Sequence, residues 1–307
     1  MTDTLSRSGK QSVISGLIPW EYQTGSGMTL RGHYTEPSGK PMIHFIHGNG
    51  FCGLTFENLL SHFQADYDLF ISDGQGHGDS DAGGKYPGWN RSAKYFAEVW
   101  SNFEGMWGKV PRIAMGHSYG AIMSTLIMSR QPKLFDMGIL MDPVYMPPVM
   151  ARTATSLKTL GLSKRMPLVR QAKARTESWE NFQAVWDYLY QRGTFKGWKD
   201  ECLKSYIDHA LIESDDGSMR LKCPPRIEAS IFSAYAKGLW PAIRRIEAPM
   251  TMLYGDRTYP FVKRSKAKVH EANLNYDFIE MPGGHCFMQE QPERTAQEIK
   301  QKLRFSL

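Results

Sequence analysis

The feature that most constrains the fold is an alternation of short apolar runs with helical patterns along most of the chain. The apolar runs are four to six residues long and bounded by Gly, Asp or Pro, as buried strands are; they span 42–46, 67–72, 112–115, 138–141, 250–254 and 276–281. Apolar residues recur at helical spacing between and after them, over 56–64, 95–107, 121–130, 263–272 and 294–304. This alternation predicts a doubly wound, mostly parallel sheet covered on both faces.

The alternation stops after Asp142-Pro143 and resumes near Ala248-Pro249. The residues between contain no convincing strand, and 179–191 and 198–212 are amphipathic. We therefore predict a mostly helical insertion, residues 145–245, on a core formed by residues 1–144 and 246–307. Ligands of open α/β sheets bind at the carboxyl ends of the strands, so we expect the insertion to lie over those ends.

Composition excludes several classes of protein. The 37 Lys+Arg and 31 Asp+Glu residues give a formal charge of +6, too diffuse to indicate a nucleic-acid partner. The longest apolar runs, such as 137–141, are far shorter than the ~20 residues of a membrane-spanning helix. The N-terminus carries no apolar secretory segment, and the four cysteines show no C-x-x-C spacing. We therefore expect a cytoplasmic protein with reduced thiols; the oligomeric state stays open.

One segment, 145–176, is strongly basic and contains no acid. It is either a solvated face of the insertion or a surface that attracts an acidic substrate. Its cations are Arg152, Lys158, Lys164, Arg165, Arg170, Lys173 and Arg175.

A glycine motif at residues 48–53 offers one functional hypothesis. Gly48, Gly50 and Gly53 fit G-x-G-x-x-G between a strand and a helical pattern, and Asp73 follows about 20 residues later. Glycines and an acid at this spacing are typical of a dinucleotide-binding turn and would make the protein an oxidoreductase. That fingerprint normally follows the first strand of its domain, whereas a strand-like stretch, 28–34, comes earlier here.

The strongest chemical signal is the pentapeptide 116–120, Gly-His-Ser-Tyr-Gly, which fits G-x-S-x-G between a predicted strand and a predicted helix. Its glycines allow a turn sharp enough to expose the Ser118 hydroxyl above the sheet. The backbone N–H of Tyr119, at the start of the helix, is then placed to stabilise an oxyanion. We interpret Ser118 as a nucleophile; an ordinary turn serine is the alternative.

A nucleophilic serine needs a base that a third group orients. His285 is the best of the nine histidines, because it follows the last predicted strand in a glycine-rich loop. His47 and His77 lie in glycine-rich turns and are expected to hold those turns by hydrogen bonds. His117 neighbours the nucleophile in sequence, but adjacent side chains diverge. For the third member, both Asp142 and Asp256 preserve the chain order Ser…Asp…His.

Four motifs in this order resemble those of the α/β-hydrolase superfamily, and closely its capped esterase-type members. They cover about residues 28 to 305 and comprise His47-Gly48-Asn49-Gly50, Gly76-His77-Gly78-Asp79-Ser80, the turn at Ser118, and Gly283-Gly284-His285. The resemblance implies an α/β-hydrolase fold with a helical cap inserted after the strand that ends at Asp142. It also implies an oxyanion hole formed by the N–H groups of Asn49 and Tyr119, which makes Asp73 a turn residue.

The sequence departs from the family at one place. The usual acid stands three residues after the glycine that ends the strand beyond the cap, and Thr258 occupies that position. Some members carry the acid after the strand that precedes the cap, where this chain has Asp142. We therefore predict Asp142 as the acid and Asp256 as a structural turn residue.

Related dehalogenases and epoxide hydrolases use an aspartate nucleophile, so Ser118 indicates acyl transfer. The predicted reaction is hydrolysis of a small carboxylic ester or thioester with an apolar part, through an acyl-enzyme. No cofactor is needed and no metal-ligand spacing is present. A C–C bond hydrolase, a lactonase or a perhydrolase would use the same residues, and a non-catalytic ligand-binding protein is a further alternative.

The insertion is rich in large apolar side chains, which either line an acyl pocket or pack its own helices. They are Met146, Met150, Trp179, Phe182, Trp186, Tyr188, Phe195, Trp198, Phe232 and Trp240.

Overall fold

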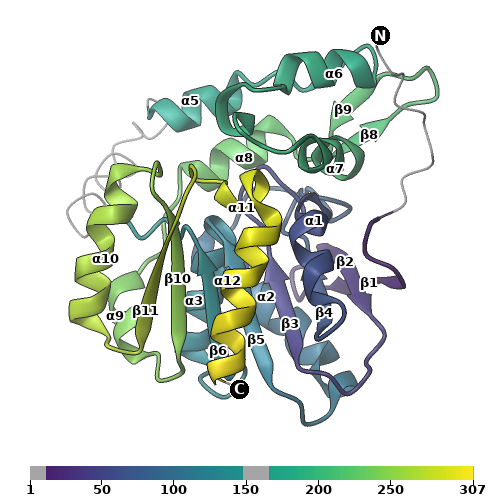
Figure 1. Ribbon diagram of the computed structural model, residues 1–307. Helices are drawn as coiled ribbons and strands as arrows, with labels where there is room; N and C mark the ends of the chain where they lie inside the picture. The colour runs from purple at the N-terminus through teal and green to yellow at the C-terminus, as the bar shows by residue number, and fades with distance from the viewer. Residues whose placement is uncertain (1–11, 148–165, 307) are drawn as a thin grey trace.

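The computed structural model describes residues 12–147 and 166–306 (Figure 1). Its central sheet has eight strands in the order β1-β2-β4-β3-β5-β6-β10-β11. Strand β2 runs antiparallel to its neighbours β1 and β4, and all other adjacent pairs are parallel. The strands are β1 Leu17–Gln23, β2 Thr29–Thr35, β3 Met42–Ile46, β4 Asp68–Ser72, β5 Arg112–His117, β6 Met137–Met141, β10 Met250–Gly255 and β11 Tyr276–Met281. This confirms the predicted doubly wound, mostly parallel sheet.

Helices cover both faces of the sheet (Figure 1). Because the central strands are buried on both faces, their side chains divide alternately between two cores: Met42 and Ile46 of β3 join one, and Ile43 and Phe45 the other. On the first face pack α2 Trp89–Phe103, α3 Tyr119–Arg130, α9 Leu239–Arg245 and α10 Pro260–Ala272. On the second pack α1 Glu57–Leu60, α11 Phe287–Glu290 and α12 Pro292–Ser306.

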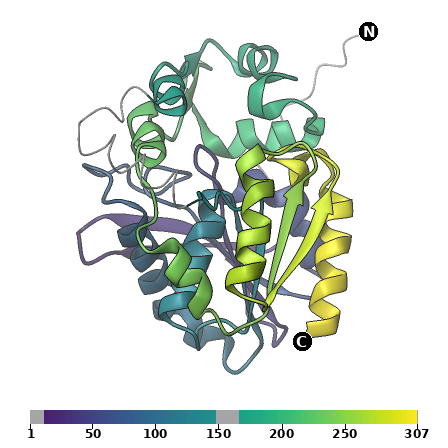
Figure 2. The same ribbon diagram turned by 90° about the vertical axis from the view of Figure 1, so that its left-hand side faces the viewer.

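The elements from α5 to α8 form a separate layer, which lies over the carboxyl ends of the parallel strands (Figures 1 and 2). The expectation of no strand in this segment is wrong. Three strands form a small antiparallel sheet, β7-β9-β8, but at two or three residues each they are too short to show alternation. The layer comprises α5 Pro167–Lys173, β7 Ser178–Trp179, α6 Phe182–Leu189, α7 Asp200–Ala210, β8 Leu211–Glu213, β9 Met219–Leu221 and α8 Pro225–Phe232.

Buried polar contacts attach α7 to the core. The Ser205 hydroxyl donates to Glu57 Oε1 at 2.5 Å, and His209 Nε2 lies 3.2 Å from the same oxygen. Glu57 is only 3% exposed, so these contacts satisfy a carboxylate that would otherwise be costly to bury. These hydrogen bonds therefore attach the layer from α5 to α8 to the core, in addition to the two points where the chain passes between them.

Several of the ten large apolar residues predicted for the insertion pack against other aromatic side chains. Phe195 and Trp198 are buried, and the Trp198 ring packs 5.6 Å from that of Phe51 in the core. Phe182 and Trp186 stack on each other along α6. Met150 lies outside the described residues, as do four of the predicted basic residues, Arg152, Lys158, Lys164 and Arg165.

All four cysteines are buried and unpaired. Among the described residues, no helix has both the length and the apolar character needed to cross a membrane.

Candidate active site

Ser118 occupies a sharp turn between β5 and α3. Its φ of +53° is a left-handed conformation that is uncommon for any residue but glycine. The turn depends on the glycines at either side. A Cβ on Gly116 would lie 2.5 Å from the carbonyl carbon of Gly120, and a Cβ on Gly120 would lie 2.0 Å from the Ile46 carbonyl oxygen. The chain can therefore pass this point only with both glycines present.

His285 reaches Ser118 from the loop between β11 and α11. Its Nε2 lies 2.9 Å from the Ser118 hydroxyl oxygen, and its Nδ1 lies 2.5 Å from Asp142 Oδ2. Because a carboxylate can only accept, Nδ1 carries the proton that bonds Asp142. Nε2 is then an acceptor, and the Ser118 hydroxyl donates to it.

Asp142 lies directly after β6 and is completely buried. In addition to His285, its carboxylate accepts hydrogen bonds from the backbone N–H of Gly255 at 3.0 Å and from the Thr258 hydroxyl. The two oxygens thus have three donors, which is what a buried carboxylate requires. The structure brings Ser118, His285 and Asp142 into one hydrogen-bonded chain.

The other candidate acid, Asp256, points elsewhere. Its Oδ1 accepts the backbone N–H of Gly283 at 2.8 Å, and its side chain is 38% exposed beside Arg257. The Gly283 hydrogen bond holds the pKa of this carboxyl below its ordinary value. Asp256 makes no hydrogen bond to His285 among the described residues.

The loop that follows β3 places Asn49 beside the serine turn. Among the described residues, neither the backbone N–H of Asn49 nor that of Tyr119 has a hydrogen-bond acceptor. The Asn49 side chain is fixed by donating to the Glu228 carbonyl at 3.1 Å. Two backbone donors without partners next to a nucleophile are what an oxyanion hole requires.

His47 and His77 hold this loop, as the sequence predicted. His47 Nε2 accepts the N–H of Gly74 at 3.0 Å, and His77 Nε2 accepts that of Gly50 at 2.9 Å. Both rings are fully buried, and burial lowers the pKa of His47 to about 4. The rings therefore stay neutral, as acceptors of hydrogen bonds must be.

Asp73 is a turn residue and not a candidate ribose ligand. Its Oδ1 accepts the N–H of Gly53 at 2.6 Å, and the carboxylate is 4% exposed. Its other oxygen fills the space beside Gly78, where a Cβ would lie 1.9 Å away. Gly53 also begins only a 3-10 turn, followed by the four-residue helix α1. The geometry of this loop does not fit a dinucleotide-binding turn.

One residue at the site has a contact that the sequence gave no signal for. His117 Nε2 lies 3.0 Å from the His285 carbonyl oxygen and donates to it, because a carbonyl can only accept. The other ring nitrogen, Nδ1, is buried without a partner among the described residues and faces Gly48. Burial, with a smaller effect of His285, lowers the pKa of His117 well below its ordinary value. His117 thus joins the serine turn to the loop that carries His285.

Among the described residues, no group of three or more His, Cys, Asp or Glu side chains is arranged to hold a metal ion.

Residues 45–298 match the model of the alpha/beta hydrolase family. The chain belongs to the alpha/beta hydrolase family. No curated protein matches this hydrolase, but many solved structures share its fold.

Three of these structures are similar over nearly the whole hydrolase. E-2-(acetamidomethylene)succinate hydrolase has a TM-score of 0.77 at 21% identity, with 94% of this chain and 99% of that one covered. The peroxisomal alpha-beta-hydrolase Lpx1 of Saccharomyces cerevisiae has a TM-score of 0.75 at 16% identity, with 94% and 89% covered. A thioesterase domain from the curacin biosynthetic pathway has a TM-score of 0.71 at 18% identity, with 93% and 99% covered. At these identities the similarity establishes the fold alone.

Proposed function

We propose that this hydrolase cleaves a carboxylic ester or thioester with an apolar part, using Ser118 as nucleophile, His285 as base and Asp142 as the acid that orients the base. The observation that carries the proposal is the hydrogen-bonded chain from Asp142 through His285 to the Ser118 hydroxyl. A serine is a weak nucleophile unless a positioned base removes its proton, and this chain supplies that base.

The first half of the reaction acylates Ser118. Its oxygen bonds to the substrate carbonyl carbon while its proton passes to Nε2 of His285. The carbonyl oxygen becomes an oxyanion, which the N–H groups of Asn49 and Tyr119 stabilise; each such donor typically contributes roughly 10²–10³ in rate. The tetrahedral intermediate then breaks its bond to the leaving alcohol or thiol, which takes the proton from Nε2.

The second half releases the acyl group. A water molecule gives a proton to Nε2 of His285 as its oxygen attacks the acyl carbon. Collapse of the second intermediate breaks the bond to the Ser118 oxygen, which recovers its proton from Nε2, and a carboxylic acid leaves. Buried Asp142 stabilises the imidazolium that forms in each half.

Residues 145–245 serve in this proposal as a cap over the site. A partly buried ion pair supports this role: Arg175 Nη1 lies 2.8 Å from Glu228 Oε2, next to Gly50 in the loop that carries the proposed oxyanion donor Asn49. We also propose a cytoplasmic location, which the four unpaired, buried thiols support.

The test is a series of p-nitrophenyl esters of increasing acyl length, together with matched thioesters. Ser118→Ala is expected to lose several orders of magnitude in kcat/KM and all labelling by a fluorophosphonate probe. Ser124→Ala is the matched control, because Ser124 is also a buried serine and lies on α3, the helix that begins directly after Ser118. Activity that survives in Ser118→Ala would contradict the assignment of the nucleophile. A wild-type protein that neither hydrolyses these substrates nor reacts with the probe would favour a non-catalytic ligand-binding role.

A further inference from the structure

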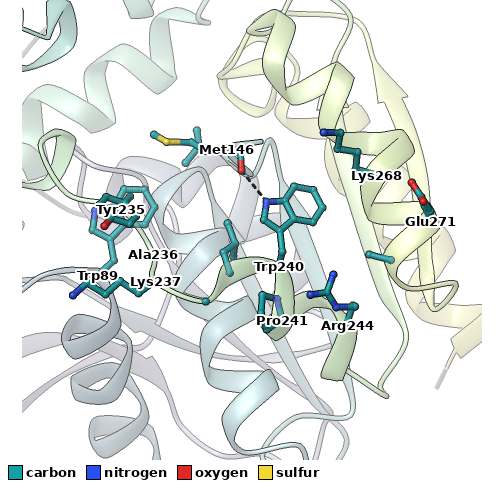
Figure 3. A pocket seen from close by; sticks show the side chains of 14 residues that line it. Trp89, Met146, Tyr235, Ala236, Lys237, Trp240, Pro241, Arg244, Lys268 and Glu271 are labelled. Carbon is teal, nitrogen blue, oxygen red and sulfur yellow. Dashed lines mark hydrogen bonds between the residues drawn. The ribbon is translucent and has the colours of Figure 1, made fainter. Parts of the chain in front are cut away.

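The structure contains a cavity of about 680 Å³ at the surface of the core (Figure 3). It is bounded by Trp89 at the start of α2, by Val144 and Met146 after β6, and by α9 and α10. None of the residues proposed for catalysis lines it. Its size falls within the range of small-molecule sites, about 300–1,000 Å³.

The apolar walls of this cavity are fixed in place. The Trp240 indole N–H donates to the Met146 carbonyl at 3.0 Å, and the Trp89 indole N–H donates to the Ile231 carbonyl at 3.0 Å. Since both N–H groups are used inside the protein, the two indoles contribute ring surface to the wall. A wall held in this way costs a ligand little ordering of side chains on binding.

The rim of the cavity is positively charged. Lys237, Arg244 and Lys268 line it, with Glu271 as the one acid among the lining residues (Figure 3). Within residues 12–147 and 166–306, none of these three cations forms an ion pair with a carboxylate. Their charges are therefore available to a ligand, and the rim favours an anion over a cation.

The backbone at the rim is held as well. The Asn90 side chain forms two hydrogen bonds with Lys237, accepting its N–H at 2.8 Å and donating to its carbonyl at 2.9 Å. Lys237 thus projects from a fixed position. The cavity combines preformed ring surfaces with unpaired cations at its edge.

We propose that this cavity binds a small molecule with a flat apolar body and an anionic group, such as a carboxylate, phosphate or sulfonate. The body packs on Trp89 and Trp240, and the anion is held by Arg244 and Lys268. Such a molecule has two sources. It is either part of the substrate, since Val144 follows Asp142 by two residues and the Trp89 ring packs 5.3 Å from that of Tyr119, or a separate ligand.

Binding is tested on Ser118→Ala protein, so that the result does not depend on hydrolysis. The probes are 8-anilinonaphthalene-1-sulfonate and N-phenyl-1-naphthylamine, which share an aromatic body but differ in the sulfonate. Arg244→Gln with Lys268→Gln is expected to weaken binding of the sulfonate probe at least about tenfold, or about 1.4 kcal/mol, and to leave the uncharged probe unchanged. Trp240→Leu is expected to weaken both.

The control is Arg245→Gln with Arg264→Gln, which removes two cations from the same helices at positions outside the cavity lining. This variant is expected to bind both probes as the parent does. Equal weakening by the two charge pairs would overturn the proposal, because it would show a general effect of net charge. The proposal would also be overturned if the sulfonate probe does not bind, or if its affinity is unchanged in the Arg244→Gln, Lys268→Gln variant.

The two sources are separated on the active enzyme. Competitive inhibition by the sulfonate probe, against the p-nitrophenyl ester with the highest kcat/KM, would support the cavity as part of the substrate site. Inhibition that leaves KM unchanged, or no inhibition by a probe that still binds, would support a separate ligand. This arm depends on the proposed function; the binding arm does not, so failure of one is distinguishable from failure of the other.

Discussion

The Thr258 hydroxyl donates a hydrogen bond to Asp142 Oδ2, the same carboxylate oxygen that faces His285 Nδ1. Thr258 stands where related hydrolases usually carry the acid of the triad, after the strand beyond the cap. The two alternative positions for the acid therefore converge on one point beside the imidazole. In this hydrolase one of these positions carries Asp142, and the other carries Thr258, whose hydroxyl holds the Asp142 carboxylate.

Because both positions face the same ring, we predict that a carboxylate at position 258 can replace the one at position 142. Asp142→Asn is expected to lose roughly 10⁴ in kcat, because the amide disfavours the required tautomer of His285. Adding Thr258→Asp places a carboxylate within reach of the same ring and is expected to recover at least about tenfold of that loss. The kcat of both variants is measured by steady-state hydrolysis of a p-nitrophenyl ester.

The matched control for this exchange is Asp142→Asn with Thr258→Asn, which has the same shape without the charge. It is expected to stay as inactive as Asp142→Asn alone. Equal recovery by the Asn and Asp variants would show that packing, not charge, explains the effect.

A second prediction ranks the two candidate acids. Asp256→Asn is expected to change kcat/KM only slightly, since the amide oxygen can still accept the Gly283 N–H and the side chain is 38% exposed. Asp142→Asn should lose orders of magnitude in the same assay. The opposite ranking would assign the acid to Asp256.

The sequence predicted most of the fold, because the central strands are buried on both faces and therefore read as short apolar runs. It missed β1, an edge strand in which only Trp20 is buried and which contains Pro19. Edge strands tolerate proline and need no apolar face, so they leave little pattern. The predicted helix 56–64 is also divided, into α1 and a 3-10 turn at Ser61–Phe63.

The site was less predictable than the fold where it depends on contacts between loops. Local turn chemistry singled out Ser118 and its glycines, and chain order reduced the acid to two candidates. No local pattern reports that His117 donates to the His285 carbonyl across 168 residues of chain. Likewise, the packing of Trp198 on Phe51 is a long-range contact that composition cannot separate from a pocket wall.

A third prediction treats His117 as a positioning residue. His117→Phe keeps a ring in the buried site but removes the hydrogen bond that ties the base loop to the serine turn. We expect it to lower kcat/KM about 10²-fold, as small displacements of catalytic groups do. His117→Gln places an amide nitrogen near the position of Nε2 and is expected to restore most of the rate.

The control for His117 is His44→Gln. His44 is equally buried, on β3, and its polar partner is the Ser72 hydroxyl, away from the site. The His44→Gln variant is expected to have a lower free energy of unfolding but an unchanged kcat/KM. If His117→Phe and His117→Gln are equally impaired at equal free energies of unfolding, the hydrogen bond to His285 does not position the base.

A fourth prediction concerns the pH dependence of stability at Asp73. Burial raises the pKa of Asp73 to about 7 in the folded protein, whereas an unfolded chain has a value near about 3.9. Between these values the folded state binds the extra proton, so the contribution of Asp73 to the free energy of unfolding is largest below the lower value and is lost as pH rises through the upper one.

The asparagine in Asp73→Asn cannot ionise, so this variant does not lose free energy of unfolding as the pH rises. Relative to wild type, its free energy of unfolding should therefore rise between pH 5 and 7, with a slope of at most about 1.4 kcal/mol per pH unit, and level off above that. Urea unfolding across this range measures it. Asp81→Asn provides a comparison of opposite sign, because the Arg31 hydrogen bond lowers the pKa of Asp81 and stabilises its charged form. Parallel pH profiles for wild type and Asp73→Asn would mean that the carboxylate stays charged in the turn, and its hydrogen bond from Gly53 would then have to outweigh its burial.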